Sequence, residues 1–106
     1  MIVDNGFFGL LAAGSLTSTV VQSSTISGNG ATGVRLVGAR GITVGGVDLT
    51  TVNGISDNPG WGILATGWSR GSTLLGNGVS NNGRGDVNTI FAIGLRRGVV
   101  ARGSTP

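Results

Sequence analysis

Short runs with aliphatic residues at alternate positions recur along this chain, and each of the clearest runs begins directly after a glycine. In these runs the first and third residues are aliphatic, and extended backbone places them on one face of a strand. The runs occupy residues 10–12, 34–36 and 63–65. A second apolar run follows each of them, at 18–21, 42–44 and 73–75, and a third run surrounds Ile26, Ile55 and Val79. The pattern therefore predicts three short strands in each repeating unit.

The units share a motif, Asn-x-x-x-Gly-aliphatic. It begins at Asn5, Asn29 and Asn58, and a degenerate copy begins at Asn82, where Asp86 takes the place of the glycine. Successive asparagines are 24, 29 and 24 residues apart. Self-similarity at a nearly constant period is typical of repeat proteins. Three strands and three corners in about 24 residues predict one turn of a parallel β-helix, so the fold expected is an all-β solenoid of about four coils.

The motif asparagines are expected to have a structural role. Asparagine tolerates the left-handed conformation that a tight corner needs, and its side chain bonds to nearby backbone. In coils stacked about 4.8 Å apart, equivalent amides form a ladder along the stack. The expected ladder consists of Asn5, Asn29, Asn58 and Asn82.

Further expectations follow from aligning the units. The extra residues of the second unit, 47–51, are expected to project as a loop, because an insertion inside a strand would break the register. Residues 1–94 are assigned to the coils, with another strand at 89–93, and residues 95–106 to a basic, flexible C-terminal tail. Neither end resembles a cap, so we expect a fragment of a longer β-helix, or a chain that stacks end to end on a partner or on itself. The expected core comprises Leu10, Ala12, Val20, Ile26, Val34, Leu36, Val44, Ile55, Ile63, Ala65 and Val79.

Composition agrees with an all-β repeat and excludes several classes. Of 106 residues, 22 are glycine, which disfavours helices. The net charge of +3 is spread over the chain, and the one arginine cluster is Arg96, Arg97 and Arg102, so no nucleic-acid partner is expected. No stretch approaches the roughly 18–20 apolar residues that span a bilayer, and the start lacks the basic region of a signal peptide.

The stretches 26–36 and 55–64 resemble the "N-x-x-x-G-I-x-L" coils of the right-handed parallel β-helix repeat family, the pectate-lyase-like superfold. The resemblance covers roughly residues 4–87 and implies a right-handed parallel β-helix. That family includes polysaccharide lyases, polygalacturonases, alginate epimerases, phage tailspikes, surface adhesins and noncatalytic carbohydrate-binding segments. The resemblance therefore implies an extracellular or cell-surface location, but it does not select one activity.

The acidic residues give little indication of catalysis. The chain has no His, Lys, Glu or Tyr, and its four acids are Asp4, Asp48, Asp57 and Asp86. Asp4 and Asp57 are expected about 10 Å apart, two coils away from each other, which is too far to share one Ca²⁺. No two acids form the carboxylate pair of a glycosidase. We expect solvated corner carboxylates, no metal, no cofactor and no catalytic residue.

Five residues are candidates for contact with a polysaccharide: Trp61, Trp68, Arg35, Arg40 and Arg70. Exposed indole rings stack on sugar C–H groups, and guanidinium forks suit uronate carboxylates. The alternatives are that the two rings cover corners of the third coil and that the arginines are ordinary solvated charges. Arg40 and Arg70 are seven and eight residues past their motif glycines, so the sequence places them close in register but not at equivalent positions.

The leading hypothesis is a noncatalytic parallel β-helix module of a secreted or surface protein that contacts carbohydrate. One alternative is a truncated piece of a polysaccharide lyase or glycoside hydrolase whose catalytic coils are missing. The other is a purely structural spike or spacer. Ice binding is disfavoured because the threonines form no regular Thr-x-Thr array.

Overall fold

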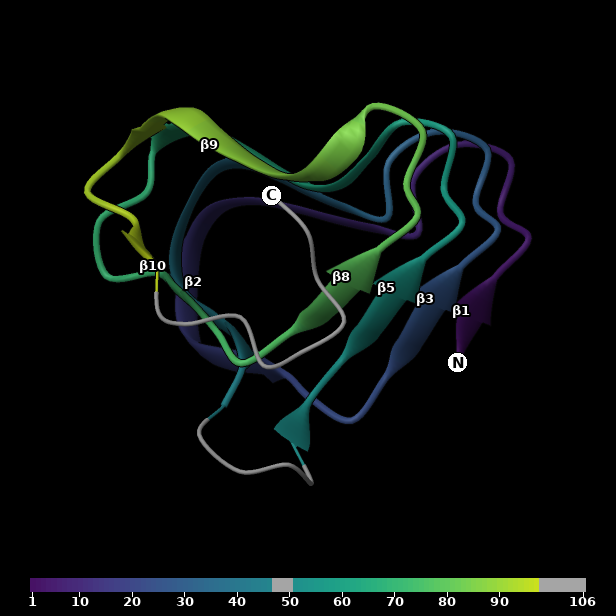
Figure 1. Ribbon diagram of the computed structural model, residues 1–106. Coiled ribbons are helices and arrows are strands. Elements are labelled where there is room, and N and C mark those ends of the chain that lie inside the picture. The colour runs from purple at the N-terminus through teal and green to yellow at the C-terminus, as the bar shows by residue number, and fades with distance from the viewer. Residues whose placement is uncertain (47–50, 98–106) are drawn as a thin grey trace.

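The chain folds into two parallel β-sheets, and the computed structural model describes residues 1–46 and 51–97 (Figure 1). These residues contain no α-helix. One sheet has the strand order β1 (Ile2–Val3), β3 (Thr25–Ser27), β5 (Gly54–Ser56) and β8 (Gly78–Ser80). The other has the order β10 (Arg96–Arg97), β7 (Thr73–Leu75), β4 (Val34–Gly45), β6 (Trp61–Trp68) and β9 (Gly85–Ile93), and β2 (Leu10–Val21) also pairs with β4. The all-β, parallel character predicted from the alternating runs is confirmed.

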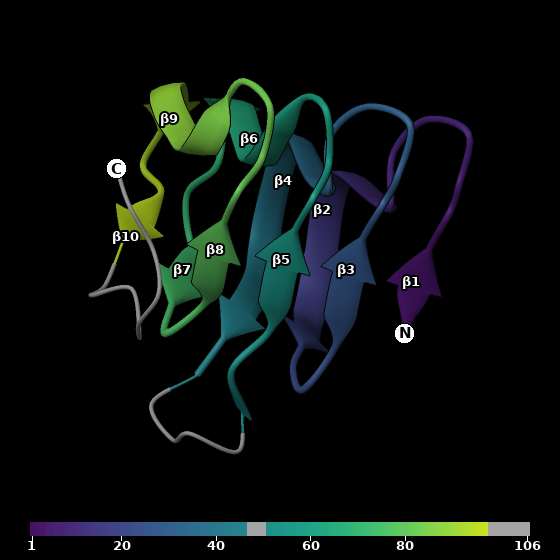
Figure 2. The same cartoon turned by 45° about the vertical axis from the view of Figure 1, so that its right-hand side comes forward.

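Strands pair with their equivalents in the next repeating unit (Figure 2). In the first sheet Ile2 pairs with Ile26, Ile26 with Ile55 and Ile55 with Val79. In the second sheet β4 is a long bent strand, whose first half pairs with β6 and whose second half pairs with β7. Two runs expected as separate strands are thus continuous through a bend in β4. The predicted strand at 89–93 forms the end of β9.

The left-handed corner lies one residue earlier than we expected. The residue before each motif asparagine has a φ between 55° and 64°, whereas the asparagines themselves have no positive φ. These corner residues are Asp4, Gly28, Asp57 and Asn81. Glycine, asparagine and aspartate tolerate this conformation best, which explains why these types occupy the corner. The motif asparagine is therefore free to turn its side chain inward.

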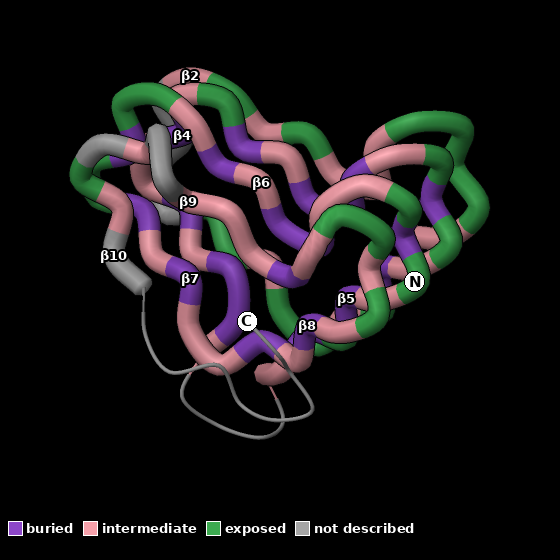
Figure 3. The backbone as a smooth tube through the Cα atoms, turned by 45° about the horizontal axis from the view of Figure 1, so that its top comes forward, coloured by how far each residue is buried: buried purple, intermediate pink, exposed green. Residues whose placement is uncertain are grey.

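The core lies between the two sheets, on the inward face of each strand (Figure 3). Eight of the expected core residues are buried, and Leu10 and Ala12 are partly buried against them. Val20 was wrongly expected inside: it is 53% exposed, because it pairs with Thr43 on the outward face while Val21 pairs with the buried Val44. The buried apolar residues are Ile26, Val34, Leu36, Ala39, Ile42, Val44, Ile55, Ile63, Ala65, Leu74 and Val79.

Two expectations fall wholly or partly outside the described residues. The loop expected at 47–51 contains Asp48 and lies outside them except for Thr51. Most of the expected tail, 98–106 with Arg102, also lies outside them. Arg96 and Arg97, which the sequence assigned to the tail, form β10 and pair with β7, so the second sheet extends to Arg97.

Candidate functional site

The motif asparagines form a continuous chain of hydrogen bonds along the stack of units. The Oδ1 atoms of Asn29, Asn58 and Asn82 each accept two bonds, from the backbone N–H and the Nδ2 of the asparagine one unit earlier, at 2.9–3.1 Å. Asn29 and Asn58 are each 1% exposed. The side chains of Asn29 and Asn58 connect one unit to the next and are not available to a ligand.

A second ladder, which the sequence analysis missed, runs through Ser24, Asn53 and Asn77. The Oδ1 of Asn53 accepts the backbone N–H of Ser24 at 3.0 Å, and its Nδ2 donates to the Oδ1 of Asn77 at 2.9 Å. Nδ2 of Asn77 donates in turn to the carbonyl of Val44. The steps from 24 to 53 and from 53 to 77 equal the spacings of the first ladder, 29 and 24. The second ladder could have been predicted from this shared spacing, but position 24 is a serine and not an asparagine, so the repeat was not apparent.

Arg35 takes part in the pairing of two strands. It is partly buried, and its Nη1 donates to the carbonyl of Leu36 at 2.8 Å and to the hydroxyl of Thr66 at 3.1 Å. A longer bond of 3.4 Å reaches the carbonyl of Leu64. The guanidinium therefore bridges β4 and β6, away from the corner that contains Arg40 and Arg70.

The two tryptophans do not form one platform, because they stand at opposite ends of β6. Trp61 is partly buried, and its ring lies so close to Gly85 that a Cβ added there would be 2.5 Å from Cζ3. Its backbone N–H donates to the Thr32 hydroxyl at 3.4 Å. Trp61 is thus packed within the stack, whereas Trp68 is 49% exposed.

Trp68 lies where the third unit has one residue more than the second. Paired residues of β4 and the third unit are 29 apart before the bend (Val37 and Thr66) and 30 apart after it (Thr43 and Thr73). The flanking glycines of the bend remain matched: Gly41 and Gly71 both have φ of 83°. The extra residue therefore falls within the corner, where Ala39 and Ser69 are both buried and Trp68 is exposed.

The insertion brings two arginines into register, which corrects the sequence-based alignment. Arg40 precedes Gly41 and Arg70 precedes Gly71, so they occupy equivalent positions in neighbouring units, about one strand spacing of 4.8 Å apart. Counting from the motif glycines missed this equivalence because the count passes through the inserted residue. Arg40 is partly exposed and Arg70 is exposed.

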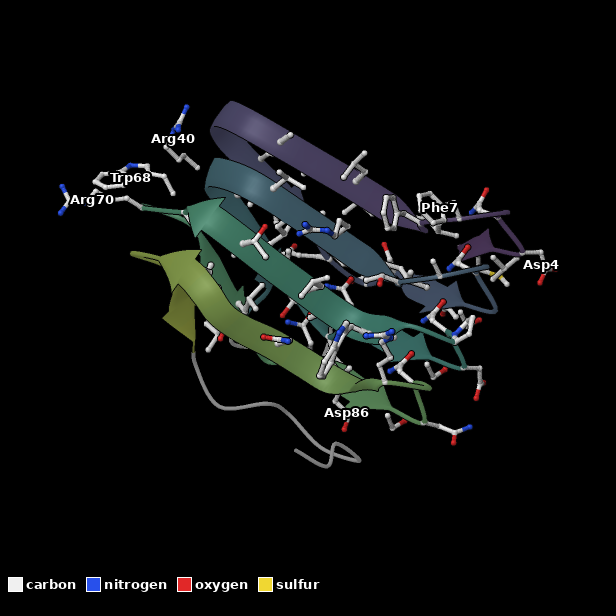
Figure 4. The ribbon with its side chains drawn as sticks, turned by 90° about the horizontal axis from the view of Figure 1, so that it is seen from above. Asp4, Phe7, Arg40, Trp68, Arg70 and Asp86 are labelled. Atoms are coloured by element: carbon white, nitrogen blue, oxygen red, sulfur yellow. The ribbon has the colours of Figure 1, made fainter. Side chains whose placement is uncertain are left out.

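Arg40, Trp68 and Arg70 gather at one edge of the molecule, with the indole ring between the two arginines in the view of Figure 4. The Cζ atom of Arg70 lies 5.5 Å from the centroid of the Trp68 ring, a cation–π contact. Within the described residues neither arginine forms an ion pair with a carboxylate. We call these three residues the arginine–tryptophan edge. Chemically it offers two guanidinium forks and an apolar ring to a ligand with negative charge and a flat apolar surface.

The carboxylates do not assemble into a site. Asp4 and Asp57 are separated by the unit that contains Gly28, and Asp57 accepts a bond from Nδ2 of Asn81. Asp86 is only 4% exposed, so the expectation of a solvated carboxylate is wrong for this residue. Its backbone lies in β9, opposite the buried Gly62. Among the residues that the structure describes, no three His, Cys, Asp or Glu side chains are grouped as a metal site requires.

Comparison of this chain with protein-family models, with curated proteins and with solved structures found no match. The described part of the chain also contains no helix with the length and apolar character needed to cross a membrane.

Proposed function

We propose that this chain is a right-handed parallel β-helix module without catalytic activity of its own, and that it binds acidic carbohydrate at the arginine–tryptophan edge. The location that fits this function is outside the cell or at its surface.

The pairing pattern supports the β-helix. Partner residues in the first sheet differ by 24 or 29 residues, the same steps that separate the motif asparagines. A chain that meets its own equivalent position after each unit, always in parallel, requires a crossover between every pair of strands, and such crossovers are right-handed in nearly all proteins. The resemblance of residues 26–36 and 55–64 to right-handed β-helix coils points the same way.

The positions of the acids support a noncatalytic module. Glycosidases need two carboxyl groups about 5–10 Å apart that face one substrate. Asp57 is engaged with Asn81 at an exposed corner, while Asp86 is buried in β9. Asp4 lies at the same corner as Asp57 but two units away, at about 10 Å by strand spacing and so at the limit of that range, and the acids give the truncated-enzyme alternative little support.

The observation that most supports carbohydrate binding is the insertion of Trp68 between two arginines in register. An indole left half in water at a corner provides a stacking surface for the C–H face of a sugar. The contact with Arg70 orients that guanidinium beside the ring. Two guanidinium forks on either side of one indole ring are suited to carboxylates on a uronate chain, with Trp68 contacting the ring that bears one of them.

A fluorescence titration tests this function. The chain has two tryptophans, so Trp61→Phe leaves Trp68 as the one emitter. We expect its emission to change on titration with oligogalacturonate and to change much less with a neutral oligosaccharide of equal length. Arg40→Met and Arg70→Met should each weaken binding about tenfold, the equivalent of about 1.4 kcal/mol for a lost charge-assisted contact.

Arg35→Met is the matched control, because Arg35 bonds to Thr66 and to backbone carbonyls away from the edge. It should leave the oligogalacturonate affinity unchanged. An unchanged Trp68 emission with both sugars, together with no heat of binding by calorimetry, would reject carbohydrate binding and favour the structural spacer. Equal binding of the neutral and acidic sugars would reject the role of the arginines.

A further inference from the structure

The motif glycines lie where successive units approach closely. A Cβ added to Gly33 would lie 2.8 Å from the carbonyl oxygen of Gly62 and from Cγ2 of Ile55, and 2.9 Å from Nδ2 of Asn58. The equivalent distances at Gly9 and Gly62 are 2.4–2.7 Å. Real Cβ atoms essentially never approach other heavy atoms within 3.0 Å. Glycine is therefore required at this position wherever another unit follows.

Asp86 occupies this same position in the fourth unit. Trp61 pairs with Gly85 and Ile63 with Val87, so Asp86 lies opposite Gly62. Figure 4 shows Asp86 at the side of β9 that faces away from β6. A fifth unit of the same kind would place its own glycine carbonyl and asparagine amide where Asp86 already has a Cβ and a carboxylate. We call this side of the fourth unit the β9 face.

The opposite end of the stack has the features of an open interface. We call it the β2 face: the side of β1 and β2 that faces away from β3 and β4. Asn5 is exposed there, and within the described residues its Oδ1 accepts no hydrogen bond, whereas the other three ladder asparagines each accept two. Two large apolar side chains of the first unit, Met1 and Phe7, are also exposed.

We propose that the β2 face is an interaction surface for a further unit of the same Asn-x-x-x-Gly kind, and that Asp86 closes the β9 face to such a unit. The partner unit would supply a glycine at the tight position and an asparagine whose backbone N–H and Nδ2 donate to Oδ1 of Asn5. This interface continues one that the structure already contains three times, between its own successive units. The proposal does not depend on carbohydrate binding.

Directionality follows from the two faces together. A second copy of this chain presents Asp86 on its β9 face, so copies do not stack end to end. Of the two expected modes of end-to-end stacking, on a partner or on itself, the proposal therefore keeps only stacking on a partner. Removing the side chain of Asp86 should create a β9 face that fits the β2 face of the next copy, and the result would be a growing head-to-tail assembly.

Light scattering after size-exclusion chromatography tests the proposal on the full chain and on Asp86→Gly. We expect wild type to elute as one species whose mass is independent of concentration, and Asp86→Gly to form assemblies whose mass increases with concentration. Asp86→Ala is the matched control: it loses the same carboxylate but keeps a Cβ at the tight position. It should behave as wild type does.

A second variant distinguishes stacking from aggregation. Leu10 donates its backbone N–H to Gly33 at 2.9 Å, so the N–H of Leu11, the next residue of a parallel strand, points to the open side. Proline at an open edge blocks strand addition without removing a bond inside the sheet. Adding Leu11→Pro to Asp86→Gly should restore a single species with an unchanged β circular-dichroism spectrum. The proposal is overturned if Asp86→Gly has the mass of wild type, if Asp86→Ala assembles equally, or if Leu11→Pro leaves assembly intact.

Discussion

Replacing Asn58 by leucine is the sharpest test of how the stack is held together. Leucine has the same number and branching of side-chain heavy atoms as asparagine, so the change removes hydrogen bonds while it leaves no cavity. The Oδ1 of Asn58 accepts the backbone N–H of Asn29 at 3.0 Å and the Asn29 Nδ2 at 3.1 Å. Its Nδ2 donates to the carbonyls of Ile26 and Ser56 and to Oδ1 of Asn82. Asn58 is 1% exposed, so water cannot simply replace these bonds.

The expected loss follows from the groups that remain without this partner. A buried polar group left without a hydrogen bond costs about 1–3 kcal/mol. The backbone N–H of Asn29 loses its acceptor completely, and the carbonyl of Ile26, in a buried contact, loses the donor that Asn58 supplied. Two such groups give a destabilisation of about 2–6 kcal/mol. A domain of this size is stable by about 5–15 kcal/mol, so the variant should lose a large share of its stability.

Urea unfolding followed by circular dichroism gives the free energy of unfolding of each variant. Asn5→Leu is the matched control, because Asn5 is exposed and its side chain makes one bond within the described residues, to Oδ1 of Asn29. It should cost less than about 1 kcal/mol, the net value of a typical hydrogen bond. Equal losses for Asn58→Leu and Asn5→Leu would refute the view that burial makes the ladder stabilising.

Three further comparisons use the same measurement. Gly33→Ala should lower the free energy of unfolding by about 2–4 kcal/mol, because its Cβ would overlap the next unit. Gly54→Ala, with no atom within 4 Å of its Cβ, should be neutral or slightly stabilising. Similar changes in stability for both variants would contradict the tight contact at Gly33. Asn53→Ala should cost about 2–3 kcal/mol through the second ladder, and a loss below about 0.5 kcal/mol would show that this ladder contributes little. Ile42→Ala should lower the free energy of unfolding by about 2–5 kcal/mol, because Ile42 is buried. Val20→Thr should change it by less than about 0.5 kcal/mol, because Val20 is exposed, and the reverse order would disprove the assignment of faces.

Much of the pairing could be predicted from the sequence because each repeated position meets its own equivalent. The steps between Asn5, Asn29 and Asn58 anticipate the pairing of Ile2 with Ile26 and of Ile26 with Ile55. Alternation also gave the correct inward residues in the first strand of each unit, where pairing is regular. A motif that fixes one residue per unit thus fixes the register of the strand beside it.

The predictions were wrong for residues whose register had to be counted through a bend in the strand. The pairing of β2 with β4 shifts register between Ala13 and Ser15 and again before Thr19. Such irregularities reverse the side of the sheet that a residue faces, and this explains why Val20 is outside. The same effect concealed the equivalence of Arg40 and Arg70, because Trp68 adds one residue within their corner. Gly14, Gly38 and Gly67 mark these bends in the sequence, but they do not show how many residues each bend contains.

The two residues on which the proposals rest are both departures from the repeat, and this is a physical reason to assign them a role. The units can be compared with one another position by position. A residue type that stacking requires recurs from unit to unit, as the motif glycine and asparagine do. Trp68 pairs with Ile93 of β9 but has no counterpart in the second unit, and about half of its surface remains in water. Asp86 stands where a following unit would demand glycine. We therefore assign a residue that stacking does not require to one of three roles: contact with a ligand, contact with a partner, or ending the stack.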